Sequence, residues 1–258
     1  MKVLRKIGAG LAVLFVAACS APSSYADSSG PAPSTVVSSS PAPPPVASPT
    51  RGPATVAVPE IGYPAVGGGA YDYAAAAGPV AGTAGRLLTY RIAVERDITG
   101  LSPAGFAEAV EAVFADPRSW PGTGQWRLRR AGAGERFDFT IYLVTPATRD
   151  RLCHSSFDRY TSCRNGDSVV INVARWVHGV PDYGADLVTY RQYVINHETG
   201  HRLFHGHELC TGPGRPAPVM QQQTLGLHGC TANAWPIVDG RLYAGRSGQY
   251  DDPLPRDP

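Results

Sequence analysis

The chain is poor in lysine and carries almost no net charge. Lys2 and Lys6 are its only lysines, and 23 basic residues face 21 acidic ones, a formal charge of +2. Because Lys2, Arg5 and Lys6 are three of those 23, the rest of the chain holds 20 basic residues against 21 acidic ones. The absence of lysine beyond Lys6 excludes Schiff-base chemistry. The absence of a basic excess argues against a nucleic-acid partner.

The apolar run near the N-terminus is too short for a permanent transmembrane helix. It extends from Ile7 to Ala18 and follows the basic residues, as in a signal peptide. Its end, Val16-Ala17-Ala18-Cys19, resembles a bacterial lipobox, which predicts a lipoprotein signal peptide over residues 1–18 and lipidation of Cys19. The alternative is ordinary cleavage after Ala26. Both predict export, to the extracytoplasmic face of the cell membrane or into the medium.

Cysteine is scarce, and no two cysteines have the C-x-x-C spacing typical of cysteine-ligated zinc. Setting Cys19 aside leaves four cysteines, an even number suited to an oxidising compartment. Four cysteines allow three pairings. Closure of local loops favours disulfides Cys153–Cys163 and Cys210–Cys230.

Residues 19–85 are rich in proline, alanine, serine and glycine and almost free of charge, which predicts a disordered linker. A folded domain is predicted over residues 86–238, with a disordered tail over 239–258. Alternating patterns predict strands at 87–95, 126–130, 137–145 and 168–177. Ser102-Pro103 opens one predicted helix, and residues 182–204 form a second, longer one. This order predicts an α+β domain: a mixed β-sheet, a backing helix and a long helix that carries the active site.

The long helix contains a zinc-binding pattern. His197 and His201 are four residues apart, so their imidazoles lie one turn apart on one face and can share a metal ion. Glu198 is rotated from His197 by about 100°. It is therefore placed to act as general base toward a zinc-activated water, the chemistry of peptide-bond hydrolysis.

A catalytic zinc site uses three protein ligands and an open fourth position. His205 and His207 are the candidates for the third. On a continuing helix, His205 would lie about 12 Å along the axis from His197, too far to share one ion. His207 follows Gly206, where the helix can end and the chain can turn back. Geometry thus favours His207, with His205 as the alternative.

The segment His197 to His207, HETGHRLFHGH, resembles the metzincin signature H-E-x-x-H-x-x-G-x-x-H. The resemblance implies a zincin-type fold, a zinc peptidase activity, and His197, His201 and His207 as ligands of Zn²⁺. It also implies Glu198 as general base and Met220, in Ala217-Pro218-Val219-Met220, as the Met-turn. Two features depart from the pattern: Phe204 replaces the signature's glycine, and Gln221 to Gln223 follow Met220 where some metzincins have a tyrosine.

Residues 86–238 also resemble an uncharacterised actinobacterial family of exported proteins and lipoproteins with a zincin-like domain. The shared landmarks are the His205-Gly206-His207 ending, the segment 213–222, and Cys230 followed by Trp235-Pro236.

The leading hypothesis is an exported, monomeric zinc metalloendopeptidase, held at the membrane by a lipid anchor and acting on a peptide or protein substrate, with a cell-wall peptide crosslink as a variant. The second hypothesis is a non-catalytic zinc-binding module of the cell envelope. Three histidines with an open position would favour the enzyme, and a closed site of four protein ligands would favour the module.

Overall fold

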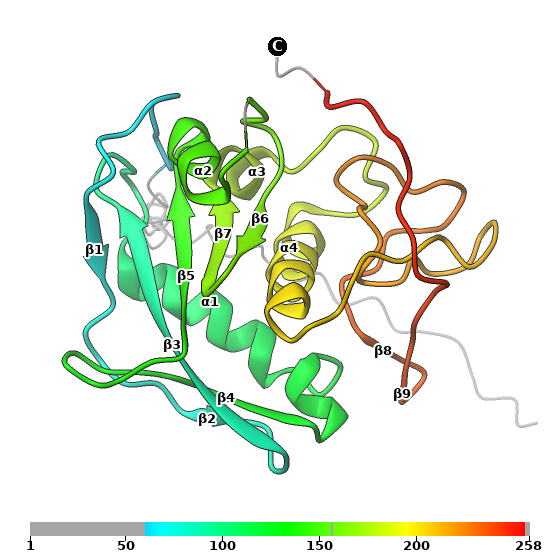
Figure 1. Ribbon diagram of the computed structural model, residues 1–258, viewed down its shortest axis with the longest axis horizontal. Coiled ribbons are helices and arrows are strands. Elements are labelled where there is room, and N and C mark those ends of the chain that lie inside the picture. Colours follow the sequence, from blue (N-terminus) through cyan, green and yellow to red (C-terminus); the bar gives the residue numbers. More distant parts are fainter. Residues whose placement is uncertain (1–59, 156, 256–258) are drawn as a thin grey trace, which may run out of the picture. The chain divides into compact units, whose positions relative to one another are not determined.

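The computed structural model describes residues 60–155 and 157–255, which form an α+β fold around a mixed seven-stranded sheet (Figure 1). The strands are β1 (Tyr71–Tyr73), β2 (Val80–Ala81), β3 (Arg86–Glu95), β4 (Trp126–Arg130), β5 (Phe139–Val144), β6 (Cys163–Asn165) and β7 (Ser168–Asn172). The predicted signal peptide, Cys19 and the linker up to residue 59 lie outside the described residues.

The sheet has the order β2-β4-β3-β5-β7-β6, and β1 pairs with β3. The central pairs β3–β4, β3–β5 and β5–β7 are parallel. The short strands β1, β2 and β6 are antiparallel to their neighbours. The predicted mixed sheet is confirmed, and its parallel centre explains why β5 and β7 read as almost continuous apolar runs.

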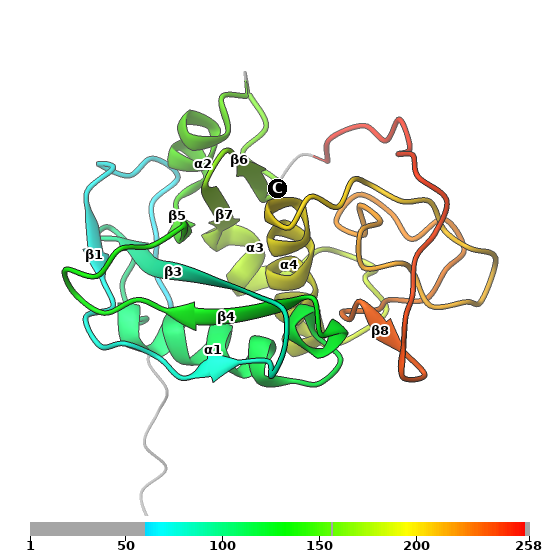
Figure 2. The same cartoon turned by 60° about the horizontal axis from the view of Figure 1, so that its bottom comes forward.

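Four α-helices pack with the sheet: α1 (Pro103–Ala115), α2 (Pro146–Cys153), α3 (Val173–His178) and α4 (Leu187–Arg202). A 3₁₀ helix, η1 (Trp120–Thr123), precedes β4. Helix α1 begins as predicted, because the Ser102 side chain accepts a hydrogen bond from the Gly105 N–H and Pro103 opens the first turn. Figures 1 and 2 show α4 between the sheet and the loop-rich C-terminal part of the chain.

Two predicted element boundaries are wrong, because a polar side chain caps the start of a helix at each of them. The strand predicted over 168–177 ends at Asn172, whose side chain accepts from the Ala174 N–H at 3.0 Å and caps α3. The long helix predicted over 182–204 begins only at Leu187, after the cap Asp186, and ends at Arg202. Helix α2 was not predicted from the sequence, since it is short and has no clear apolar stripe.

The folded domain also begins earlier than residue 86. Strand β1 pairs with the end of β3, and β2 pairs with β4. The buried Glu95 carboxylate accepts hydrogen bonds from the Gly69 N–H at 2.9 Å and the Thr145 N–H at 2.7 Å. A Cβ atom at Gly67 would lie 2.2 Å from this carboxylate. Backbone pairing and close glycine approach attach this segment together with a few apolar side chains such as Ala74, which belongs to the core, so its composition concealed it.

The tail predicted to be disordered over 239–258 is likewise part of the structure up to residue 255. It contains β9 (Arg241–Leu242), which pairs with β8 (Ile237–Val238), and then runs back along residues 207–210. Among the described residues, none of the helices has the length and hydrophobicity of a membrane-spanning segment.

The core lies between the sheet and helices α1 and α4. Its fully buried side chains come from β3, β5, β7 and both helices, and include Ile92, Phe106, Phe139, Ile171 and Tyr193. The packing fixes α4 against the β6–β7 side of the sheet and so sets the position of the helix that carries His197 and His201.

Candidate metal centre

Helix α4 and the segment that follows it bring three histidine side chains together. The Nε2 atom of His201 lies 3.2 Å from Nε2 of His197 and 3.1 Å from Nε2 of His207. His197 is buried and the other two are half-buried. Within the described residues, this is the one group of three metal-ligating side chains whose ligand atoms converge.

Hydrogen bonds fix which ring nitrogen of each histidine carries the proton. Nδ1 of His197 lies 2.8 Å from the Val219 carbonyl oxygen, and Nδ1 of His201 lies 2.8 Å from the His205 carbonyl oxygen. A carbonyl oxygen can only accept, so both Nδ1 atoms donate and both Nε2 atoms hold a free lone pair. His207 is held in the same way by Oε1 of Gln249, at 3.0 Å from its Nδ1.

This arrangement fits a tetrahedral metal ion. Unprotonated Nε2 atoms about 3.2 Å apart would face one another as acceptors, an unfavourable contact that a shared cation removes. Zinc bonds of about 2.0–2.1 Å at tetrahedral angles place two ligand nitrogens about 3.3 Å apart, close to the distances found here. Burial lowers the pKa of His197 well below its usual value and that of His201 to about 4, which favours the neutral form a metal requires.

The turn after α4 selects His207 rather than His205 as the third member. The Phe204 N–H donates to the His201 carbonyl and the His205 N–H to the Gly200 carbonyl, the two bonds of a Schellman motif. Its left-handed position is Phe204, with φ of 71°. The expectation that the chain turns at Gly206 is wrong, because the residue with positive φ is Phe204 and not Gly206.

His205 has a different place. Its ring stacks on Trp120 with centroids 4.2 Å apart, and its carbonyl oxygen orients His201. Trp120 itself donates from Nε1 to the Asn196 carbonyl of α4. His205 is therefore not placed as a ligand itself, but it helps to orient the candidate ligand His201.

Glu198 is buried, and its Oε2 atom has no hydrogen-bond partner. Burial raises its pKa to about 8; the positive charge of Arg149 opposes this rise and the negative charge of Asp158 adds to it. A buried carboxylate oxygen without a partner is costly for folding alone. It borders the same cleft as the three histidines.

Met220, the only methionine after Met1, is buried beneath the histidines. A Cβ atom at Gly200 would lie 2.4 Å from the Met220 sulfur and 2.7 Å from Cζ2 of Trp120, so the helix backbone itself packs on both side chains. The carbonyl of the preceding residue, Val219, is the acceptor for His197. The segment through Met220 thus supports the centre from below.

Both expected disulfides, Cys153–Cys163 and Cys210–Cys230, are present. Their presence is consistent with an extracytoplasmic protein. The first joins α2 to β6, and the second joins the segment after His207 to the loop that follows Met220.

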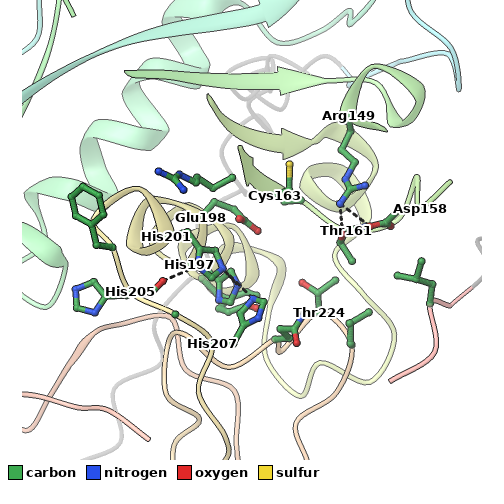
Figure 3. A pocket seen from close by; sticks show the side chains of 18 residues that line it. Arg149, Asp158, Thr161, Cys163, His197, Glu198, His201, His205, His207 and Thr224 are labelled. Atoms are coloured by element: carbon green, nitrogen blue, oxygen red, sulfur yellow. Dashed lines mark hydrogen bonds and ion pairs between the residues drawn. The ribbon is translucent and has the colours of Figure 1, made fainter. Parts of the chain in front are cut away.

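A cleft of about 640 Å³ opens at the histidines. Figure 3 shows Arg149, Asp158 and Thr161 close together beyond Glu198, with Thr224 between them and His207. Nη2 of Arg149 lies 2.7 Å from Oδ2 of Asp158, and both side chains are largely buried. Sequence analysis missed these residues, because α2 and the loop before β6 carry no recognisable motif and reach the cleft only through the fold.

A family model described as "Protein of unknown function (DUF3152)" matches residues 58–240, so the chain belongs to this family. The match begins near the start of the described structure rather than at residue 86. Comparisons with curated proteins and with solved structures found no significant match.

Proposed function

We propose that this DUF3152 protein is an exported zinc-dependent metallopeptidase, with His197, His201 and His207 as zinc ligands and Glu198 as general base. One observation carries the proposal: three histidine Nε2 atoms converge beside a buried carboxylate oxygen that has no partner, at the base of an open cleft. A purely structural zinc site has four protein ligands and no use for such a carboxylate.

A bound zinc ion would supply Lewis acidity, polarising a carbonyl group and lowering the pKa of a water molecule. The residues of the chain would do the rest. Glu198 accepts the proton of the attacking water and passes it to the nitrogen of the leaving amine as the C–N bond breaks. The Val219 and His205 carbonyls hold His197 and His201 in the required tautomer.

A peptide substrate is supported by the strand beside the cleft. β6 is the last strand of the sheet and pairs only with β7 among the described strands. Cys163 and Arg164 of β6 border the cleft. An extended peptide could pair with the free edge of β6 and place its backbone carbonyl near the histidines. The likeness of segment 197–207 to the metzincin signature, with Met220 packed below it, supports the same function.

The setting of this activity is proposed from the N-terminal sequence. The lipobox around Cys19 supports a lipid anchor at the extracytoplasmic face of the membrane, and the two disulfides suit that compartment. The proposed partners are the membrane and a peptide or protein substrate, for a monomer that does not bind nucleic acid.

The test combines metal content with hydrolysis of a mixed peptide library. The purified protein should hold about one zinc ion, and His201→Ala should lose it, since two histidines leave the ion short of a ligand. Glu198→Gln should keep the zinc and lose hydrolysis by a factor of at least about 100. His178→Ala and Glu108→Gln, at exposed positions away from the cleft, are the matched controls.

Three results would contradict the proposal. Hydrolysis by Glu198→Gln at the wild-type rate would show that Glu198 is not the general base. Wild-type protein that binds no zinc would show that the three histidines do not form a zinc site. Zinc bound with no cleavage of any peptide would favour the non-catalytic zinc-binding module instead.

A further inference from the structure

The third histidine is held by the C-terminal end of the chain rather than by α4. Residues 245–254, which we call the C-terminal strap, run antiparallel to residues 207–209. The Leu209 N–H donates to the Arg246 carbonyl at 2.9 Å, and the Gly248 N–H donates to the His207 carbonyl at 3.0 Å. Glu208 and Ser247 form an antiparallel bridge. His207 thus lies in a short two-stranded ribbon whose other strand is the strap.

The strap also supplies the side chain that orients the His207 ring. Oε1 of Gln249 accepts a hydrogen bond from Nδ1 of His207. The corresponding partners of His197 and His201 are backbone carbonyls, that of Val219 in the segment before Met220 and that of His205 in the turn after α4. His207 depends instead on a side chain 42 residues further along the chain.

Specific contacts anchor the strap on both sides of Gln249. On one side, the Gly245 N–H donates to the Glu208 carboxylate at 2.8 Å, and a Cβ atom at Gly245 would lie 2.2 Å from the Leu209 carbonyl oxygen. On the other, the Tyr250 ring stacks on His228 with centroids 3.4 Å apart, and Asp252 pairs with the same histidine at 2.8 Å. Leu254 then borders the cleft. These contacts leave Gln249 a fixed position beside His207.

We propose that the C-terminal strap completes the metal centre, with Gln249 as the positioning residue that holds His207 in its metal-binding tautomer and orientation. The inference rests on the proposed zinc site. Histidine ligands are generally fixed by a hydrogen-bond acceptor at the other ring nitrogen, and loss of such an acceptor weakens metal binding by about 10–100-fold. The strap lies beyond residue 240, where the match to the family model ends.

Zinc affinity, measured on the full chain by competition with a chromophoric chelator, tests the proposal. Gln249→Leu removes the acceptor and should weaken zinc binding by about 10–100-fold. Gln249→Glu keeps an acceptor oxygen on a side chain of the same length. It should therefore bind zinc at least about tenfold more tightly than Gln249→Leu does. Gln125→Leu, the same exchange at an exposed glutamine that does not border the cleft, should bind like the wild type.

Gly245→Ala tests the strap without touching Gln249. The added methyl group would meet the Leu209 carbonyl and displace the strap, so zinc affinity should again fall. The Tm of each metal-free variant shows whether the rest of the fold is intact.

Wild-type affinity in both Gln249→Leu and Gly245→Ala would overturn the proposal. Equal losses in Gln249→Leu and Gln249→Glu would also overturn it, because the acceptor would then not be what matters. A wild-type protein that binds no zinc would overturn the metal centre itself, so failure of the two proposals can be told apart.

Discussion

At the scale of single residues, Phe204 is the least expected feature of the centre. The residue at the left-handed position of a Schellman motif is usually glycine, because the Cβ atom of any other residue is sterically strained at positive φ. Here a phenylalanine takes φ of 71°, and its ring remains 74% exposed. The turn that delivers His207 is therefore formed against a local cost, and the surrounding contacts must hold it.

Phe204→Gly should accordingly stabilise the protein. Relief of the left-handed conformation gains about 1–2 kcal/mol, and the greater freedom of glycine in the unfolded chain takes back about half of it. We expect a net gain of about 0.5–1 kcal/mol, measured by denaturant unfolding. Phe204→Ala is the control: it removes the same exposed ring but keeps the strain. Equal stability of the two variants would refute this account.

At the scale of elements, α4 supports the centre through its side chains and through its backbone. Its side chains supply His197 and His201, and its backbone at Gly200 packs directly on Met220 and Trp120. The sequence predicted the helix and its histidines, because periodicity and spacing are local properties. It could not predict that the glycine between them is required by two side chains distant in sequence.

Gly200→Ala should therefore destabilise the protein, although alanine favours helix more than glycine does. The clash with the Met220 sulfur should cost about 1–3 kcal/mol and exceed the helix-propensity gain of about 1 kcal/mol. Zinc affinity should fall with it, since the clash lies under the centre.

Gly105→Ala in α1 is the matched exchange. Its nearest neighbours would be the flexible Leu101 side chain at 3.3 Å and Ser102 at 3.5 Å, so the new methyl group fits. Its unfolding midpoint in urea should equal or exceed that of the wild type. A Gly200→Ala variant as stable as Gly105→Ala would contradict the close packing of α4.

At the scale of the whole molecule, the part after α4 has little regular structure and is held by links between distant segments. Gln223 accepts from the Asn233 N–H and donates to the carbonyls of Pro218 and Asn233, while Tyr193 of α4 bonds to Gln221 and Gln223. The Cys210–Cys230 disulfide joins the His207 segment to this network. Loss of one of these links should therefore lower the zinc affinity of the metal centre.

The two disulfides should consequently differ in effect. Replacing Cys210 and Cys230 by serine should cost about 3 kcal/mol of stability and also weaken zinc binding, because the bridge lies between the His207 and Met220 segments. Replacing Cys153 and Cys163 should cost a similar amount but leave zinc affinity close to wild type, since that bridge joins α2 to β6. Equal zinc affinities in the two double variants would show that the second bridge does not support the centre.

The sequence by itself determined the local features of this protein. The spacing of His197 and His201, the Ser102-Pro103 start of α1, the buried strands and the pairing of nearby cysteines all depend on short-range geometry, and the structure agrees with them. The choice of His207 also followed from local reasoning, although the turn falls at Phe204 and not at Gly206.

Only the tertiary structure decided the rest. The β1–β2 segment consists mainly of alanine and glycine, and the C-terminal strap contains few apolar residues, so composition predicted disorder, yet backbone pairing with distant segments orders both. Arg149, Asp158 and Gln249 reach the centre from elements far from α4 in sequence. Such contacts depend on how the sheet stacks and where the chain returns, which no local pattern encodes.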